Sequence, residues 1–118
     1  ENELIQVLVN IINNSKDALL QIEGNKVIQI KTYSDLEFGY IQIFDNAKGI
    51  PEEIIEKIFE PYFTTKHKSQ GTGIGLFMVE EIIQKHLNGQ INVENISLNI
   101  DNIKYKGAEF TIKIPLNL

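Results

Sequence analysis

The first part of the chain alternates between apolar and polar positions at the period of an α-helix. Apolar side chains recur every three or four residues over residues 4–22, which predicts an amphipathic helix with one buried face. Gly24-Asn25 ends this pattern. Residues 26–33 and 36–44 then alternate with a period of two, which predicts two strands. The turn at Ser34-Asp35 is too short for a crossover, so we expect the two strands to be antiparallel.

Further helical and strand patterns follow. Pro51 and the two acidic residues after it open a predicted short helix over residues 51–59. Residues 60–72 have no clear period and predict a long irregular segment, of a kind that is usually functional or mobile. A third helix is predicted over residues 73–87, with strands over residues 90–94 and 108–115. Helices segregated from antiparallel strands predict an α+β fold, a two-layer α/β sandwich.

Composition and charge limit the classes of function. Eleven basic and 16 acidic residues give a formal net charge of -5, which argues against a duplex nucleic-acid binder. The chain has no cysteine, which excludes disulfides and thiolate chemistry and fits a reducing compartment. No apolar run approaches the roughly 20 residues of a membrane span. Because the sequence opens inside a helical pattern without Met, we expect residues 1–118 to be one domain cut from a longer protein.

A polar and basic run leads into three glycines at alternate positions, Gly71, Gly73 and Gly75, directly before the third helix. Backbone amides at such a helix start can approach an anion closely, and Lys66 and Lys68 add positive charge. The spacing is not G-x-G-x-x-G after a strand, and no Walker sequence occurs. From the residues alone, a glycine-rich turn that only allows close helix packing explains the pattern equally well.

Two further polar features are candidate ligand sites. Asn10, Asn14 and Asp17 share one face of the first helix, and the Asn14 side-chain oxygen suits Mg²⁺, although a solvated face accounts for the same pattern. Asp45 ends the second strand, where an ionised carboxylate would accept a hydrogen bond from the adenine amino group and reject the guanine carbonyl. The commoner explanation is a turn-initiating aspartate with Gly49 in an unusual backbone conformation.

Four segments, in this order, resemble the catalytic ATP-binding domain of sensor histidine kinases, which is related to DNA gyrase B, Hsp90 and MutL. They are residues 9–18 (VNIINNSKDA), 45–50 (DNAKGI), 58–66 (IFEPYFTTK) and 71–76 (GTGIGL). The resemblance covers residues 4–115, and it implies the Bergerat fold. That fold has a mixed, mostly antiparallel sheet of about five strands backed by three helices, with a mobile lid over ATP.

The resemblance also implies roles for individual residues. Asn14 is expected to bind Mg²⁺, and Asn10 and Lys66 to complete the catalytic set near the phosphates. Asp45 is expected to contact the adenine amino group, and Phe59 to belong to the motif that anchors the lid. The expected ATP-binding residues are Asn14, Asp17, Asp45, Gly49, Ile50, Phe59, Thr65, Lys66, Gly71, Thr72, Gly73, Ile74, Gly75 and Leu76.

The sequence departs from the family pattern at two places. Ala47 stands where the family usually has the middle glycine of D-x-G-x-G, so we expect a slightly reshaped loop. Residues 95–106 are longer than the usual link before the last strand. We expect them to form a wide hairpin, and no function is assigned to it.

By this resemblance the domain transfers the γ-phosphoryl group of Mg-ATP to a histidine. ATPase relatives activate water with a glutamate at the position of Asn10, whose amide is no base, whereas phosphoryl transfer needs mainly positioning and charge stabilisation. Neither His67 nor His86 lies in an acceptor motif. The acceptor is therefore expected on an upstream dimerisation domain of the same protein, with a response regulator downstream.

The same resemblance sets the expected setting of the domain. We expect a monomeric, cytoplasmic domain that is not embedded in a membrane, within a parent protein that can itself be membrane-anchored. Three other functions stay open at this point: an anti-sigma-factor-type serine kinase, a GHL-type ATPase, and a non-catalytic ATP-binding module.

Overall fold

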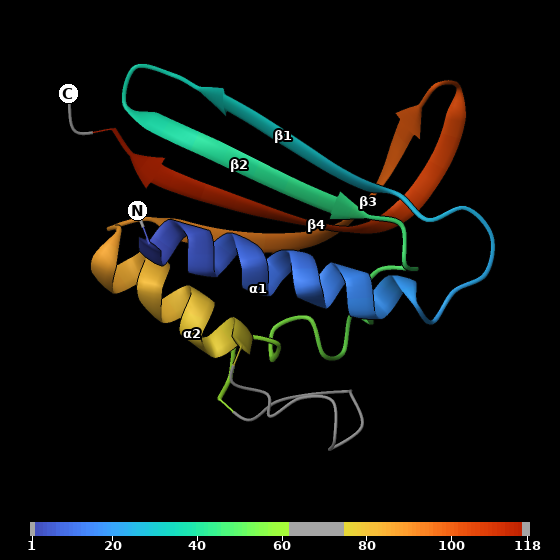
Figure 1. Ribbon diagram of the computed structural model, residues 1–118, viewed down its shortest axis with the longest axis horizontal. Helices are drawn as coiled ribbons and strands as arrows, with labels where there is room; N and C mark the ends of the chain where they lie inside the picture. The colour runs from blue at the N-terminus through green and yellow to red at the C-terminus, as the bar shows by residue number, and fades with distance from the viewer. Residues whose placement is uncertain (1, 62–74, 117–118) are drawn as a thin grey trace.

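The computed structural model of the 118-residue chain describes residues 2–61 and 75–116. Its elements are α1 (Asn2–Leu19), β1 (Ile28–Ser34), β2 (Phe38–Asp45), α2 (Gly75–Glu81), the π-helical turn η2 (Ile82–His86), β3 (Gln90–Ile100) and β4 (Ile103–Pro115). The strands form one sheet in the order β1-β2-β4-β3, and all neighbours are antiparallel. Figure 1 shows α1 and α2 on the same side of this sheet, which confirms the two-layer α+β fold.

Helix α1 turns one face toward the sheet. Val7, Ile11, Ser15 and Leu19 are its buried residues, and their spacing of four places them along a single stripe. The predicted amphipathic helix is therefore confirmed, although it ends at Leu19 rather than at residue 22. Ser15 is the polar member of this buried stripe.

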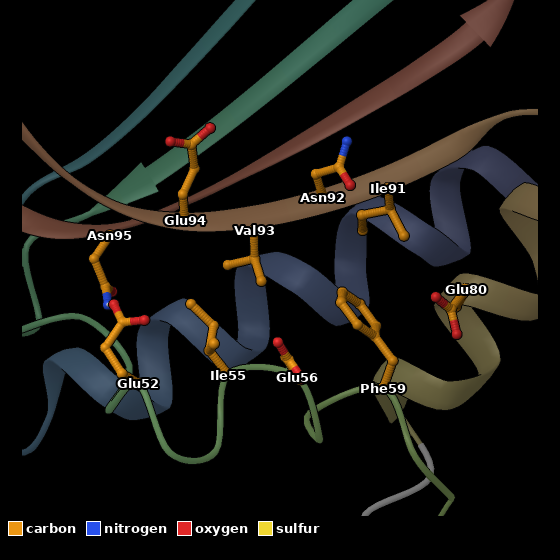
Figure 2. Close-up of a pocket in the computed structure, with 10 residues that line it drawn as sticks. All are labelled: Glu52, Ile55, Glu56, Phe59, Glu80, Ile91, Asn92, Val93, Glu94 and Asn95. Carbon is orange, nitrogen blue, oxygen red and sulfur yellow. The ribbon is translucent and has the colours of Figure 1, made fainter.

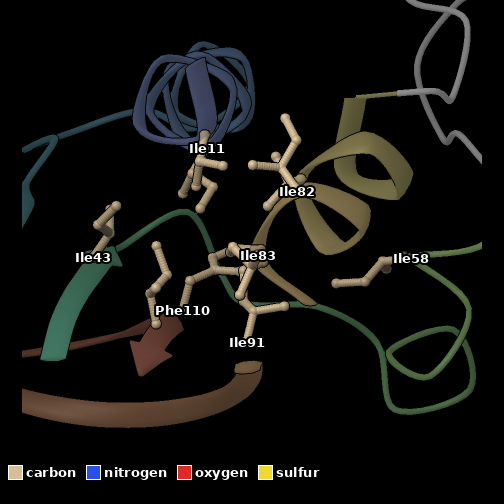
Figure 3. Close-up of a cluster of buried hydrophobic side chains, with 10 residues drawn as sticks. Ile11, Ile43, Ile58, Ile82, Ile83, Ile91 and Phe110 are labelled. Carbon is tan, nitrogen blue, oxygen red and sulfur yellow. The ribbon is translucent and has the colours of Figure 1, made fainter. Parts of the chain in front are cut away.

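The hydrophobic core lies between the sheet and the helix layer (Figure 3). Ile43 of β2 pairs with Phe110 of β4, so their side chains stand on the same face of the sheet. Figure 3 shows Ile11 and Ile83 of the helix layer directed toward this pair. Each such buried side chain contributes roughly 1.5–3 kcal/mol to folding. The core cluster consists of Val7, Ile11, Ile43, Ile58, Val79, Ile82, Ile83, Ile91, Phe110 and Ile112.

The helix predicted over residues 51–59 does not form. Successive turns replace it, with backbone hydrogen bonds of 3.0 Å from Ile54 N–H to the Pro51 carbonyl and 2.8 Å from Lys57 N–H to the Ile54 carbonyl. A helix this short is marginal on propensity alone, so tertiary contacts decide the path of the chain. Ile58 is buried in the core, and the Phe59 ring meets the Phe110 ring edge-on at a centroid distance of 6.3 Å.

The numbers of strands and helices also differ from the expectation. Residues 2–61 and 75–116 contain four strands instead of about five, and one long helix together with α2 and its π-helical continuation instead of three helices. The helix predicted over residues 73–87 is observed from Gly75 to His86. Within the same described ranges, no helix is both long and apolar enough to cross a membrane.

The wide hairpin expected at residues 95–106 is present. Strands β3 and β4 pair continuously from Gln90↔Lys113 to Ile100↔Ile103. Asp101 and Asn102 connect them, with φ angles of 52° and 69°. Two left-handed residues in a two-residue loop are typical of a type I′ turn, and Asp and Asn tolerate that conformation well. The segment thus lengthens two strands of the sheet.

Candidate functional site

Asp45 ends β2 inside the protein, where 5% of its surface is exposed. Its Oδ1 atom accepts a hydrogen bond of 3.1 Å from the Ala47 backbone N–H. Burial raises the pKa of the Asp45 carboxyl above its ordinary value, and the Ser15 hydroxyl and the Ala47 N–H partly offset this rise. An ionised carboxylate can accept about four hydrogen bonds, so Asp45 retains acceptor capacity for a ligand.

Ser15 is the polar member of the buried stripe of α1 and connects the helix to Asp45. Its side chain is 2% exposed and lies near enough to the Asp45 carboxyl to favour the ionised form. Among the described residues, Ser15 Oγ nevertheless has no partner at hydrogen-bonding geometry. A buried hydroxyl without a partner costs roughly 1–3 kcal/mol. A polar ligand or a bridging water beside Asp45 would remove that cost, so this place fits a polar group of a ligand.

The loop that follows Asp45 is fixed at its start by the Asn46 side chain. Asn46 Oδ1 accepts a hydrogen bond of 2.8 Å from the Val27 N–H, and Asn46 Nδ2 donates one of 2.9 Å to the Asn25 carbonyl. These bonds tie the end of β2 to the segment before β1. The position of Asp45 is therefore set by the sheet and by this side-chain bridge together.

The left-handed residues of this loop are Lys48, with φ of 76°, and Gly49, with φ of 80°. Ala47 does not have a positive φ. Its backbone conformation therefore does not require the glycine that the family usually has there. The usual glycine can be replaced by alanine at this position without backbone strain.

The other expected ligands lie on three elements. Asn10, Asn14 and Asp17 are partly buried on α1. Gly49, Ile50 and Phe59 lie on the segment after β2, with Ile50 and Phe59 packed against the core. Gly75 and Leu76 begin α2, and no atom of the described residues lies within 4 Å of the position that a Cβ on Gly75 would take. Thr65, Lys66, Gly71, Thr72, Gly73 and Ile74 lie outside the described residues.

An open groove of about 540 Å³ lies between β3, α2 and the turns over residues 51–60, and Phe59 is the one expected ATP-binding residue among the described residues of its lining. Figure 2 shows Ile55 and Phe59 reaching from these turns toward Ile91 and Val93 of β3. Four glutamates line the groove, so a triphosphate would be repelled there. Neither Asp45 nor the α1 asparagines belong to its lining. The lining residues are Glu52, Ile55, Glu56, Phe59, Glu80, Ile91, Asn92, Val93, Glu94 and Asn95.

In the part of the chain that the structure describes, carboxylates and histidines do not gather into a metal site with three or more protein ligands. No group of three or more His, Asp or Glu side chains is suitably placed there. Mg²⁺ commonly takes one or two protein ligands and completes its shell with waters and phosphate oxygens. A single amide oxygen such as that of Asn14 is compatible with that mode of binding.

Two residues near the site were missed in the sequence. Ser15 was given no role, and its signal was a hydroxyl at a position that the helical spacing of residues 4–22 requires to be buried. Asn95 was given no role, yet its side chain holds the backbone of Ile50. Its signal was an amide at the next inward-facing position after Ile91 and Val93, since alternate residues of a strand share one face.

Comparison with known proteins identifies the family of this chain. Residues 1–118 match the family described as histidine kinase-, DNA gyrase B-, and HSP90-like ATPase. The two-component sensor PprA of Pseudomonas aeruginosa is 31% identical over 98% of this chain and 12% of its own length. The sensor histidine kinase ZraS of Escherichia coli O157:H7 is 38% identical over 99% of this chain and 23% of its own length. The chain thus spans less than a quarter of these two relatives.

A solved structure leads to the same family. The catalytic domain of histidine kinase ThkA, in a nucleotide-free form, superposes with a TM-score of 0.74 and 32% sequence identity. The match covers 97% of this chain and 67% of that one. The chain therefore belongs to the histidine kinase-, DNA gyrase B- and HSP90-like ATPase family, and it folds as a histidine kinase catalytic domain.

Proposed function

We propose that this domain binds Mg-ATP and transfers its γ-phosphoryl group to a histidine on a separate dimerisation domain of the same protein. The observation that carries the proposal is the buried Asp45 carboxylate, with spare acceptor capacity, beside the Ser15 hydroxyl, which has no hydrogen-bond partner among the described residues. We infer that the nucleotide is ATP from family membership, since the family is one of ATPases and kinases. We infer the reaction from the relatives that are named as two-component sensors and sensor kinases.

Asp45 selects the base in this proposal. Its carboxylate accepts a hydrogen bond from the exocyclic amino group of adenine, and Ser15 takes part directly or through a water. A hydrogen bond to a charged group contributes about 1.5–3 kcal/mol. Guanine presents a carbonyl oxygen at the same place, which an ionised carboxylate repels. The domain therefore prefers ATP to GTP.

The phosphates lie toward the asparagine-bearing part of α1 and the start of α2. Asn14 contributes its amide oxygen to Mg²⁺, with Asn10 and Asp17 on the same face of α1, one turn before and one turn after it. Positive charge around the triphosphate comes from Lys66, and backbone amides come from Thr65 and residues 71–76. These roles rest on the resemblance of the segments to their counterparts in the family.

Phosphoryl transfer is favoured over hydrolysis by the residue at position 10. An amide at Asn10 cannot take a proton from water, whereas an incoming imidazole brings its own lone pair to the γ-phosphorus. The protein then has to position the two reactants and stabilise charge. The phosphorylated histidine would pass its phosphoryl group to a response regulator.

We place the domain, as a monomer, in the cytoplasm.

Two measurements on the 118-residue chain test the proposal. Calorimetric titration with ATP, ADP and GTP, with and without Mg²⁺, should show preferred binding of adenine nucleotides. Incubation with labelled ATP and a histidine-bearing dimerisation domain from the same parent protein should label that domain. Strong turnover of ATP to ADP without an acceptor would indicate an ATPase, and serine labelling a serine kinase. Binding without any transfer would indicate a non-catalytic module.

A further inference from the structure

The loop that leaves Asp45 is held at its far end by a side chain of β3. Asn95 Oδ1 accepts a hydrogen bond of 2.8 Å from the Ile50 N–H, and Asn95 Nδ2 donates one of 2.7 Å to the Ile50 carbonyl. One amide thus binds both backbone polar groups of a single residue. Asn95 Nδ2 also donates to Glu52 Oε2 at 3.3 Å, and Figure 2 shows Asn95 directed from β3 toward Glu52. Both amide protons of Asn95 are therefore used.

Asn95 and Asp45 belong to one row across the sheet. Both residues pair with Ala108 of β4, Asp45 from β2 and Asn95 from β3. Paired residues point to the same face, and neighbouring strands lie about 4.8 Å apart, so the two backbones are separated by roughly 10 Å. Ala108 between them is 4% exposed and has a small side chain. The loop over residues 46–50 therefore starts at one end of this row and is fastened at the other.

The identity of Gly49 follows from the same contact. Its φ of 80° lies in the region that favours glycine. A Cβ atom at this position would lie 2.5 Å from Asn95 Oδ1, well inside van der Waals contact. Gly49 is thus required both by its own backbone conformation and by the close approach of the Asn95 amide. Gly49, one of the expected ATP-binding residues, and the Asn95 amide on β3 therefore form one local structure.

Asn95 is not needed to form the sheet. Its side chain bonds to the loop, and its backbone pairs with Ala108 as any residue of β3 would. Without the amide, the residues before Ile50 would keep their connection to Asp45 but lose the fixed distance to β3. A ligand that needs a fixed loop would then have to order it on binding, which weakens affinity.

We propose that Asn95 is a positioning residue of the adenine site, which holds Gly49 and Ile50 in place opposite Asp45. This inference rests on the proposed function, in which the base binds beside Asp45. Asn95 does not need to touch the nucleotide. It acts through Ile50, and the effect of its loss should be confined to the base and absent from the phosphates.

Substitution of Asn95 tests this role in the 118-residue chain. In Asn95→Ala the dissociation constants of ATP, ADP and AMP should all rise about 5- to 150-fold, the effect of two lost neutral hydrogen bonds. Competition by inorganic triphosphate with Mg²⁺ should be unchanged. Asn95→Asp keeps nearly the same shape but cannot donate to the Ile50 carbonyl, so it should bind about as weakly as Asn95→Ala. Asn99→Ala, in an exposed position of the same strand, is the matched control and should bind normally.

The outcomes separate positioning from general stability. Urea denaturation of ligand-free Asn95→Ala should show a folded protein, and a uniform loss of affinity for every ligand, triphosphate included, would overturn the inference. Adenine nucleotide affinity within twofold of the parent would overturn it as well. If Asn95→Ala does not fold, Asn95→Asp decides the question by the same two criteria. Failure of the unchanged chain to bind any adenine nucleotide would overturn the proposed function and, with it, this inference.

Discussion

Replacement of Asp45 by asparagine tests the base site directly, because it removes the charge and leaves the shape of the side chain nearly unchanged. The Ala47 N–H donates to Oδ1 at 3.1 Å, and this bond would orient the new amide with its oxygen toward Ala47. The amide nitrogen would then face the ligand and present donors where the carboxylate presented an acceptor. Asp45→Asn should therefore reverse the hydrogen-bonding preference of the site.

The magnitude follows from the buried position of Asp45, 5% exposed. A hydrogen bond to a charged group contributes about 1.5–3 kcal/mol, so ATP affinity should fall by roughly 10- to 150-fold in Asp45→Asn. GTP affinity should be unchanged or improved, since the amide can donate to the guanine carbonyl. The ligand-free variant should be as stable as the parent or more stable, because the cost of burying a charge is removed.

Calorimetric titration with ATP and GTP, paired with urea denaturation of the ligand-free protein, measures both effects. Asp101→Asn is a suitable control, because Asp101 lies in the hairpin turn with φ of 52°, which asparagine also adopts. An unchanged preference for ATP in a stable Asp45→Asn protein would refute the placement of adenine at Asp45. A parallel loss of stability and of affinity for both nucleotides would point to a structural role instead.

Changes at Gly107, Asn14 and Asp45 probe the packing beside the site, the metal ligand and the effect of pH. In Gly107→Ala the new Cβ would overlap the backbone carbonyl of Asp45, so urea denaturation should show that the free energy of unfolding falls by about 3 kcal/mol or more. Gly39→Ala is the control, because its Cβ would lie 3.4 Å from the nearest side chain, and it should change the free energy of unfolding by less than about 1 kcal/mol. Asn14→Ala should weaken Mg²⁺-dependent ATP binding and phosphoryl transfer more than Mg²⁺-free adenosine binding; equal losses in calorimetry would argue against a metal role. Burial raises the pKa of Asp45 above 3.8, so the contribution of Asp45 to stability should decline as pH rises from below 3.8 through the raised pKa. ATP affinity should instead decline as pH falls through the raised pKa, because the carboxylate becomes protonated. Asp45→Asn, measured by denaturation and by ATP titration across pH, should show neither trend.

The elements that could be predicted from the sequence are those that local patterns determine. The apolar stripe of α1 has helical spacing, and the alternation in β2 places Ile41 and Ile43 on the core face. The antiparallel pairing of β1 with β2 followed from the short Ser34-Asp35 turn. In each case one segment of chain, read by itself, contains the information.

The predicted helix over residues 51–59 was wrong because contacts between distant segments outweighed local propensity. Ile58 enters the core, and Phe59 packs on Phe110, far away in the sequence. The role of Asn95 was hidden for the same reason, since its partner Ile50 lies 45 residues earlier. Asp45 could be identified from its place after a buried strand, but its burial and raised pKa depend on α1 and β4.

The β3–β4 hairpin ends in a two-residue turn, so its length can change at that tip without affecting the candidate site. The row formed by Asp45, Ala108 and Asn95 lies midway along the pairing of β3 with β4, and the pairs beyond it end at Ile100↔Ile103. Equal numbers of residues can be deleted from, or inserted into, β3 and β4 between this row and the tip without shifting the register of Asn95. This arm of the sheet can thus change in length without moving Asn95, and a tag or a second domain could be grafted onto its tip.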